Sequence, residues 1–309
     1  MNRKILGLDM GGTTIKMGLF EESGKLEEKW EIPTCTENKG ISVVNDIADA
    51  IREKLIQRQI KKEEIIGIGI GVPGVVAKNG EVKVCVNVGW KDKPLSEELQ
   101  SASGLPVYVG NDANLAALGE VWQGSGKGYQ NAVMLTLGTG IGGGVVLDGK
   151  VISGTHALAG EIGHMHVNDN ETEICGCKGK GCLEQYASAT GIVRVTKCFL
   201  EKEIDELITA KDVFESAKRG DEKAIKAVNI AGYYLGMTLA NLSLVIDPDI
   251  FIIGGGVSKA GSYFLEIIQK HYLKSMKISD EGARIYQATL GNDAGIYGAA
   301  KLVIDNMLF

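Results

Sequence analysis

The stretch ILGLDMGGTTIKMGLF, residues 5–20, sets the pattern that decides the fold. Two apolar runs flank the polar segment from Gly11 to Thr14, so the stretch predicts a strand, a tight loop and a second strand. The stretch AVMLTLGTGIGGGVVL, residues 132–147, has the same order of apolar run, Gly/Thr loop and apolar run. In both places a hairpin turn and a further strand-like segment follow. This repetition indicates an internal duplication with two similar lobes, each offering one glycine-rich hairpin.

The rest of the chain alternates between strand-like and helical patterns. No low-complexity linker separates the halves, so we expect the lobes to share a cleft near residues 110–115 and again near residue 294. The expected lobes are residues 1–112 with 296–309, and residues 113–295. Helical spacing of apolar residues predicts helices at residues 41–59, 113–123, 184–200, 210–219 and 221–245, and from Ala294 onward.

Composition limits the classes of partner. The chain has 309 residues, of which 44% are hydrophobic and 23% are charged, and its formal net charge is −6. This length favours two lobes over a single core. Because the chain has no basic stripe, we expect no binding to nucleic acid. It shows no apolar signal region and no run of about 20 apolar residues, so neither export nor membrane insertion is expected. The expected compartment is the cytoplasm, where thiols stay reduced.

Half of the six cysteines are clustered: Cys175, Cys177 and Cys182 lie together in a glycine-rich segment. His164 lies shortly before them. Three thiolates and one imidazole are a common structural zinc set, because Zn²⁺ takes four such ligands in a tetrahedron. The alternative is a group of loose thiols that behave as small buried hydrophobes, since the spacing differs from the Cys-x-x-Cys pairs of common zinc fingers. The clustering favours a zinc site.

Two carboxylates, Glu161 and Glu184, bracket the same four candidate ligands. A metal that fixes this loop would therefore also position both carboxylates. The imidazole ligand has two alternatives to His164, which are His156 and His166.

The two Gly/Thr loops are candidate phosphate sites. Residues 138–143 match G-x-G-x-x-G, but a strand and a turn follow where a dinucleotide-binding fold needs a helix. The dinucleotide interpretation is therefore rejected, and a hairpin remains whose backbone N–H groups and Thr139 hydroxyl can hold phosphate oxygens. In the first loop, Thr13 and Thr14 can donate to phosphate, and Asp9 can reach a phosphate-bound Mg²⁺. One such loop is usually only a turn, whereas two at equivalent places favour phosphate binding.

Asn111 and Asp112 end a predicted strand where the lobes should meet. An Asp in this position is often only a helix N-cap. It can also accept the proton of a substrate hydroxyl during phosphoryl transfer. Asn111 offers both a donor and an acceptor, which suits a sugar hydroxyl.

Taken together, these motifs resemble the ROK family of bacterial sugar kinases and repressors, within the actin-like/hexokinase superfamily, and most closely its glucokinases. The resemblance covers essentially the whole chain. It implies an α/β fold of two actin-like (ribonuclease H-like) lobes, each a mixed β-sheet flanked by helices, with a cleft between them. The motifs that carry it are DMGGTT at 9–14, GIGVPG at 69–74, NDAN at 111–114, LGTGIGG at 137–143, EIGH at 161–164, the cysteine cluster, GGG at 254–256 and GNDAG at 291–295.

The resemblance assigns a role to each matching residue. Asp112 is the implied general base, and His164 is implied to serve both metal and sugar. The position of His164 directly after Glu-x-Gly favours it over His166. The implied sugar-binding residues are Gly74, Asn111, Asp112, Glu161, His164 and Glu184. The implied structural zinc ligands are His164, Cys175, Cys177 and Cys182. The implied Mg-ATP-binding residues are Asp9, Gly11, Gly12, Thr13, Thr14, Lys16, Gly138, Thr139, Gly140, Gly255 and Gly256.

The chain departs from the family pattern in two respects. Lys178 stands where the cysteine loop usually has Gly, which puts the backbone angle there in question. The family's repressors carry an N-terminal helix-turn-helix domain, for which this chain has no room before the first loop.

We therefore expect ATP-dependent phosphorylation of glucose to glucose 6-phosphate by a homo-oligomer, a dimer or a tetramer. The alternatives are a kinase for N-acetylmannosamine, N-acetylglucosamine, mannose, fructose or allose, a polyphosphate-dependent kinase, a non-catalytic sugar-responsive regulator, and a purely structural zinc module.

Overall fold

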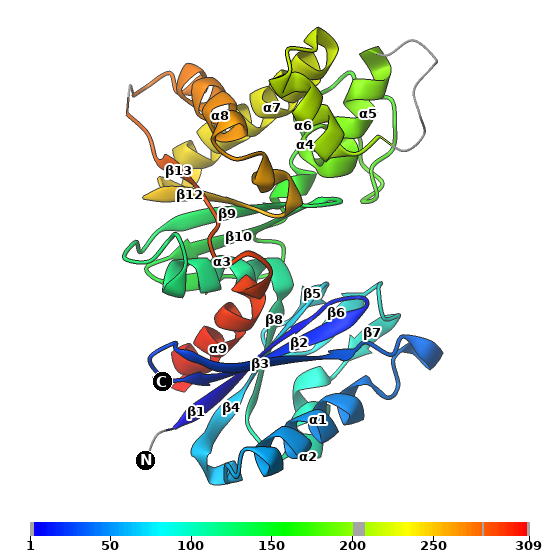
Figure 1. Cartoon of the computed structure of the whole chain (residues 1–309), viewed down its shortest axis with the longest axis vertical. Helices are drawn as coiled ribbons and strands as arrows, with labels where there is room; N and C mark the ends of the chain where they lie inside the picture. The colour runs from blue at the N-terminus through cyan, green and yellow to red at the C-terminus, as the bar shows by residue number, and fades with distance from the viewer. Residues whose placement is uncertain (1–2, 200–207, 280, 308–309) are drawn as a thin grey trace. The chain divides into compact units, whose positions relative to one another are not determined.

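The computed structural model describes residues 3–199, 208–279 and 281–307 of the chain. The chain divides into two compact units (Figure 1). Unit 1 comprises residues 1–128, 144–159 and 292–309, and unit 2 comprises residues 129–143 and 160–291. The lobes expected from the sequence have other bounds and stay a prediction.

A mixed five-stranded sheet forms the centre of unit 1. Its strands are β1 (Lys4–Met10), β2 (Thr14–Glu21), β3 (Leu26–Pro33), β4 (Ile65–Val72) and β8 (Val107–Asn111). They lie in the order β3-β2-β1-β4-β8. β1, β2 and β3 pair antiparallel, and β4 and β8 extend the sheet in parallel with β1. The first sequence repeat is thus the antiparallel half of this sheet.

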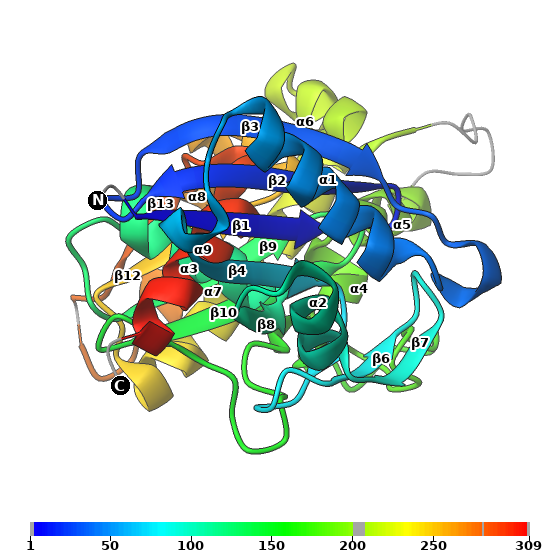
Figure 2. The same cartoon turned by 90° about the horizontal axis from the view of Figure 1, so that it is seen from below.

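Helices cover both faces of the sheet in unit 1. They are α1 (Val43–Gln57), α2 (Leu95–Ser103), α3 (Asp112–Gln123) and α9 (Ala294–Met307). Side chains alternate along a strand, so Leu6 of β1 packs with α1 and α2 whereas Ile5 packs with α9. α1 and α2 lie over the face seen in Figure 2. α9 lies close against the other face: a Cβ at Gly7 would lie only 2.1 Å from the Ile296 carbonyl oxygen. The absence of a side chain at Gly7 allows this approach.

A small antiparallel sheet follows β4 in unit 1, and the sequence patterns did not predict it. Its strands are β5 (Val75–Val76), β6 (Val82–Cys85) and β7 (Trp90–Lys93). Single-turn 3₁₀ helices complete the connections: η1 (Glu37–Lys39), η2 (Lys62–Glu64) and η5 (Gly291–Asp293).

The second sequence repeat supplies three of the five strands of a second sheet. Its strands are β9 (Ala132–Leu137), β10 (Ile141–Leu147), β11 (Lys150–Ile152), β12 (Ile250–Gly254) and β13 (Arg284–Gln287). Their order, β11-β10-β9-β12-β13, matches that of the first sheet position by position. β9, β12 and β13 are parallel, and β10 and β11 are antiparallel. The expected α/β class with two mixed sheets flanked by helices is confirmed.

Five helices of unit 2 gather on one face of this sheet (Figure 1). They are α4 (Glu184–Ala187), α5 (Ala189–Phe199), α6 (Ala210–Lys218), α7 (Glu222–Ile246) and α8 (Ser262–Ser275), with the 3₁₀ turns η3 (Ile162–His164) and η4 (Gly256–Ala260). Within the described ranges, α7 is the one helix long and apolar enough to cross a membrane by length and composition alone. Core helices pass the same test, and α7 packs closely on α8 at Gly232 and Gly236.

The single helix expected at residues 184–200 is wrong, because Ser188 separates α4 from α5. Ser188 has an extended backbone, with φ −74° and ψ 169°. Its hydroxyl donates to the Glu184 carbonyl oxygen at 2.6 Å. The next N–H, that of Ala189, donates to the Gly138 carbonyl oxygen at 2.8 Å. A bond to a distant loop thus replaces a helical bond. Residue 200, the expected end, lies outside the described residues.

Candidate functional site

The carboxyl ends of three parallel strands meet at one edge of the sheet in unit 1. Asp9 of β1 is paired in register with Gly71 of β4, and Gly71 is paired with Gly110 of β8. Asn111 and Asp112 follow directly on that edge. A Cβ at Gly71 would lie 3.4 Å from Asp112 Cα and 3.7 Å from Asp9 Oδ1. The sheet therefore brings the two carboxylates, predicted to serve the nucleotide and the sugar, into one region of unit 1.

Asn111, not Asp112, is the N-cap of α3. Its Oδ1 accepts the backbone N–H of Asn114 at 3.0 Å, and its Nδ2 donates to the Gly74 carbonyl oxygen at 3.1 Å. The cap thus also ties the start of α3 to the loop after β4. Asp112 is the first helical residue, half-buried, and its Oδ1 accepts the N–H of Ala113 at 2.9 Å. A carboxylate in this first turn is favoured by the positive end of the helix dipole.

The first Gly/Thr loop is a compact turn that exposes its backbone. The N–H of Gly11 donates to the Thr14 carbonyl oxygen at 2.8 Å. Gly12 and Thr13 are exposed, and a Cβ at Gly12 would lie 3.7 Å from the side chain of Asn87. The sequence analysis missed Asn87, because it is a lone Asn outside every motif. Lys16 is paired across the strands with Asp9, and its Nζ donates to the Asn292 carbonyl oxygen at 2.9 Å.

Asp9 sits against the start of α9. A Cβ at Gly295 would lie 2.6 Å from Asp9 Cγ, so this position needs a residue without a side chain. Burial raises the pKa of Asp9, the charge of Lys16 lowers it and the charge of Asp293 raises it, with a net pKa above the ordinary value. A nearby cation would favour the charged form, which fits the predicted Mg²⁺-facing role.

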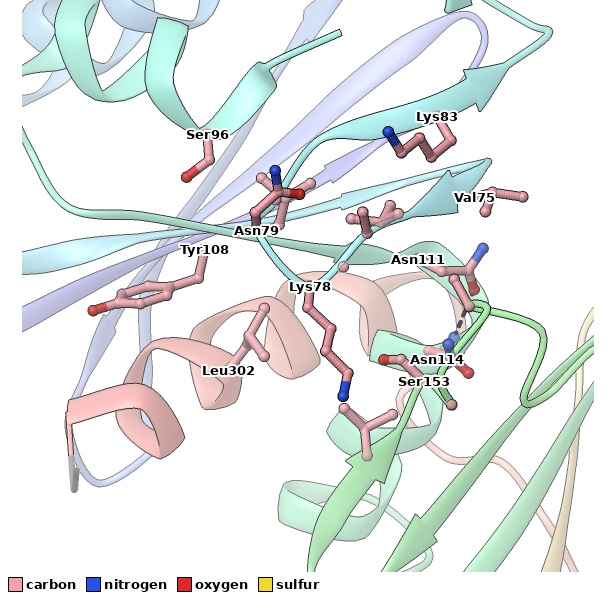
Figure 3. Close-up of a pocket in the computed structure, with 18 of the residues that line it drawn as sticks. Val75, Lys78, Asn79, Lys83, Ser96, Tyr108, Asn111, Asn114, Ser153 and Leu302 are labelled. Carbon is pink, nitrogen blue, oxygen red and sulfur yellow. Dashed lines mark hydrogen bonds between the residues drawn. The ribbon is translucent and has the colours of Figure 1, made fainter. Parts of the chain in front are cut away.

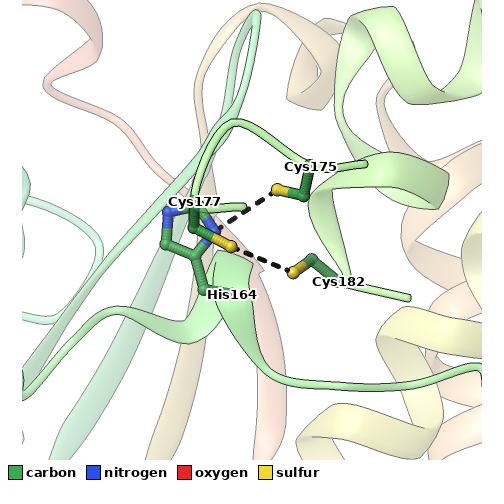
Figure 4. A group of neighbouring side chains, drawn as sticks. All are labelled: His164, Cys175, Cys177 and Cys182. Carbon is green, nitrogen blue, oxygen red and sulfur yellow. Dashed lines mark hydrogen bonds between the residues drawn. The ribbon is translucent and has the colours of Figure 1, made fainter. Parts of the chain in front are cut away.

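In unit 2 the four predicted metal ligands lie together (Figure 4). One ligand atom from each of His164, Cys175, Cys177 and Cys182 lies within 4.8 Å of the other three. The Sγ atoms of Cys177 and Cys182 are 3.5 Å apart, and Sγ of Cys175 is 3.7 Å from Nδ1 of His164. A tetrahedral zinc site with Zn–S bonds of about 2.3 Å has ligand–ligand edges of about 3.8 Å. The cluster is therefore consistent with a structural zinc site.

The local backbone explains how a short segment gathers the thiols. The N–H of Cys175 donates to the Gly179 carbonyl oxygen at 2.8 Å, and the N–H of Lys178 donates to the Cys175 carbonyl oxygen at 2.8 Å. Lys178 adopts a left-handed φ of +71°, where glycine is the preferred residue. At the departure from the family pattern, Lys178 therefore has a backbone conformation that favours glycine. The N–H of Gly179 lowers the pKa of Cys177, which favours the thiolate.

The two alternative histidines lie outside this cluster. His166 Nδ1 is 2.8 Å from the Lys180 carbonyl oxygen, and its Nε2 is 2.7 Å from Asp169 Oδ1. Both ring nitrogens of His166 therefore already have partners. His156 belongs to unit 1, in the loop after β11.

His164 presents its two ring nitrogens to different neighbours. Nδ1 faces the thiols and also lies 3.5 Å from Glu184 Oε1, while Nε2 lies 4.0 Å from Glu161 Oε2. Both carboxylates therefore border the cluster, as expected from the sequence. His164 and Glu161 are exposed, and Glu184 is half-buried.

The second Gly/Thr loop is held close to Glu184. Glu184 Oε2 accepts the N–H of Ile141 at 3.4 Å, and a Cβ at Gly140 would lie 2.7 Å from that oxygen. The Thr139 carbonyl oxygen accepts the Thr190 hydroxyl at 2.6 Å. The glycine turn after β12 adjoins this loop, because a Cβ at Gly255 would lie 2.5 Å from the Leu137 carbonyl oxygen. Unit 2 thus brings Gly138, Thr139, Gly140, Gly255 and Gly256 to one end of its sheet.

Comparison with known proteins agrees with this geometry. The model of the ROK family matches residues 5–306. The chain belongs to the ROK family. A glucokinase from Halalkalibacterium halodurans is 42% identical over 98% of this chain and 95% of its own. The crystal structure of a ROK hexokinase from Thermus thermophilus superposes with a TM-score of 0.87 at 33% identity, covering 99% of both chains. A ROK glucokinase from Streptomyces griseus, solved in complex with glucose and AMPPNP, superposes with a TM-score of 0.76 at 33% identity, covering 98% of this chain and 99% of that one.

Relatives with other names match less closely. A putative xylose repressor from a Caldicellulosiruptor species is 31% identical, covering 98% of this chain and 79% of its own. An N-acetyl-D-glucosamine kinase from Haemophilus influenzae is 31% identical, covering 96% of this chain and 98% of its own.

Proposed function

We propose that the protein is an ATP-dependent glucokinase that converts glucose to glucose 6-phosphate. The observation that carries the proposal is the full-length similarity to a ROK glucokinase solved with glucose and AMPPNP. We assign the roles in this reaction to residues at the strand ends beside Asp9 and Asp112 in unit 1 and to residues around His164 in unit 2. The proposed working form is a homo-oligomer in the cytoplasm.

In the proposed reaction Asp112 takes the proton of the primary hydroxyl as the phosphoryl group is transferred. Asn111 already uses part of its amide to cap α3 and to reach Gly74. Its second amide hydrogen and second lone pair are the groups proposed to hold sugar hydroxyls. Glu161, His164 and Glu184 are the proposed partners of further hydroxyls, together with Gly74.

The proposed nucleotide site uses the exposed backbone of both glycine loops. The N–H groups around Gly12 and Gly140 and the hydroxyls of Thr13 and Thr139 would hold phosphate oxygens. Lys16 adds a positive charge on the same edge as Asp9. Mg²⁺, when bound with ATP, neutralises charge on the transferring phosphoryl group. Zinc has a structural role in this proposal, because four protein ligands leave it no open position.

Glucose is the proposed substrate because the acceptors near His164 suit a ring with free hydroxyls. A sugar that lacks one matching hydroxyl leaves a polar group unpaired, which costs about 1–3 kcal/mol. We therefore propose that kcat/KM is higher for glucose than for N-acetylmannosamine, N-acetylglucosamine and fructose. The similarity to an N-acetyl-D-glucosamine kinase makes that sugar the main rival, and the similarity to a repressor supports a non-catalytic regulator as a second rival.

A coupled ADP-release assay tests the proposal. The purified protein is assayed with ATP against glucose, mannose, allose, fructose, N-acetylglucosamine and N-acetylmannosamine, and with glucose against polyphosphate as donor. We expect the highest kcat/KM with glucose and ATP. A higher value for another sugar would reject the glucokinase proposal and keep a sugar kinase. No turnover with any sugar, together with sugar binding in calorimetry, would instead favour the regulator.

A further inference from the structure

Unit 1 contains a pocket of about 900 Å³, and of its lining residues only Asn111 has a part in the proposed function (Figure 3). All its lining residues belong to unit 1. The pocket runs beside β8, the last strand of its sheet, from Asn111 back to Val107. At about 3.3 Å per residue this is a length of about 13 Å, and the volume is in the range of small-molecule sites. The pocket thus extends along β8 away from the Asp112 end.

Asn114, a residue that lines this pocket, carries a buried polar atom without a partner. Asn114 lines the pocket, and only 7% of its surface is exposed. Its Oδ1 has no hydrogen-bond partner among the described residues. A buried acceptor left unpaired costs about 1–3 kcal/mol, so such an atom calls for a donor from outside the protein. A hydroxyl group of a ligand is such a donor.

The charged groups that line the pocket are cationic. Among the described residues that line it, none is Asp or Glu, whereas Lys78 and Lys83 are present. Lys83 is engaged outside, at 2.8 Å from Glu81 Oε1. Lys78 has no ion pair within the part of the chain that the structure describes, and Figure 3 shows its side chain extending between Leu302 and Ser153. An anionic group is therefore the favoured charge for a ligand here.

We propose that this pocket binds a hydroxylated anion of the size of a hexose phosphate, with a hydroxyl on Asn114 Oδ1 and the phosphate near Lys78. The pocket ends at Asn111, whose side chain accepts the N–H of Asn114 and donates to Gly74. A ligand on Asn114 therefore contacts the first turn of the helix that begins with Asp112. A sugar phosphate bound here can therefore influence the position of Asp112, at the edge of the sheet where Asp9 and Asp112 lie.

Titration calorimetry on the full chain tests the site with glucose 6-phosphate and with inorganic phosphate as probes. We expect glucose 6-phosphate to bind more tightly than phosphate, because only the sugar reaches Asn114. Lys78→Glu should weaken glucose 6-phosphate binding about tenfold or more, while Lys78→Arg should restore most of it. The matched control is Lys91→Glu, an exposed lysine on the adjacent β7 that does not line the pocket; its affinity should stay within about twofold of wild type. Higher salt should weaken binding in wild type more than in Lys78→Glu.

Asn114→Leu should reduce the preference for glucose 6-phosphate over phosphate. If that variant does not fold, the Lys78 series still decides. No binding of glucose 6-phosphate to wild type overturns the proposal, and so does an unchanged affinity in Lys78→Glu, which would place the binding elsewhere. Glucose 6-phosphate is also the product of the proposed reaction, so only binding that Lys78→Glu weakens counts for this pocket. Glucose turnover of Lys78→Glu, measured alongside, separates failure here from failure of the glucokinase proposal.

Discussion

Sγ of Cys175 lies 2.9 Å from Oε1 of Glu184. This contact joins the cysteine loop to α4, the helix whose first residue is Glu184. The same Glu184 accepts the N–H of Ile141 in the second Gly/Thr loop. The position of the cysteine loop and the position of this carboxylate are therefore linked, so a change in one should be felt in the other.

Loss of one zinc ligand should therefore remove metal and activity together. Elemental analysis of the wild type should give about one zinc per chain, because the three thiols and His164 make one closed site. Cys177→Ser should lose the metal and most of the activity, since the loop that holds Glu184 is then free to move. Cys198→Ser, at an exposed cysteine on α5, is the control and should keep both. A fully active wild type without zinc would contradict the site.

The proposed role of Asp112 as general base can be tested by a substitution that removes only the charge of its side chain. Asp112→Asn keeps the size of the side chain and leaves the cap on Asn111 intact, but the amide cannot take a proton. We expect glucose binding to be largely kept and kcat to fall by about 10²-fold or more. Asp49→Asn, at an exposed position on α1, is the matched control and should have wild-type kinetics. Turnover of Asp112→Asn within a few-fold of wild type would reject Asp112 as the base.

The sequence was most informative where the chain repeats itself. Apolar runs around the two Gly/Thr loops predicted the antiparallel half of each sheet, because strand patterns are local. The short sheet β5–β7 was missed, since its strands have only two to four residues and little alternation. The break at Ser188 was missed because it depends on a bond from Ala189 to Gly138, which no local pattern contains.

In the candidate site, too, features with a local sequence pattern were predicted and features that depend on tertiary contacts were missed. The clustering of three cysteines shortly after His164 predicted the metal cluster, and the structure brings its four ligands together. The sequence offered Asp112 as the possible N-cap of α3, whereas the hydrogen bond from the Asn114 N–H to Asn111 Oδ1 assigns the cap to Asn111. The unpaired Oδ1 of Asn114 and the contact of Asn87 with the first loop are tertiary facts, and single residues carry no sequence signal for them.

Acid should weaken unit 2 through Glu171. Burial raises the pKa of Glu171, but hydrogen bonds from Arg194 and Tyr186 outweigh it and lower the pKa to about 2. A carboxyl whose pKa is lower in the folded state stabilises that state above its unfolded pKa, here 4.5. The stabilisation is thus full above pH 4.5 and is lost as the pH falls towards 2.

Glu171→Gln should therefore lower the free energy of unfolding by about 2–3 kcal/mol near pH 7. Its difference from wild type should shrink as the pH is lowered from about 6 to about 3. Denaturant unfolding at each pH measures both values. Glu173→Gln is the control, since Glu173 is exposed and lies 3.3 Å from the same Arg194, and it should change stability by less than about 1 kcal/mol. A pH-independent difference for Glu171→Gln would show that the ion pair is not its cause.

The contact of α3 with α9 depends on a glycine that ordinary helix preference opposes. A Cβ at Gly298 would lie 1.7 Å from the Leu115 carbonyl oxygen and 2.9 Å from Leu115 Cα. These are backbone atoms, so neither helix can yield without moving as a whole. α3 begins with Asp112 and α9 begins beside Asp9, so both carboxylates depend on this contact.

Gly298→Ala should destabilise unit 1 by about 3 kcal/mol or more, although alanine is the better helix former by about 1 kcal/mol. Gly232→Ala in α7 gains the same helix preference, and its new methyl meets a side-chain methyl, Cγ2 of Ile267, at 2.4 Å, whereas the methyl at residue 298 meets a backbone carbonyl oxygen at 1.7 Å. We therefore expect a much smaller loss for Gly232→Ala in denaturant unfolding. A folded Gly298→Ala protein as stable as wild type would mean that the two helices do not touch at Gly298.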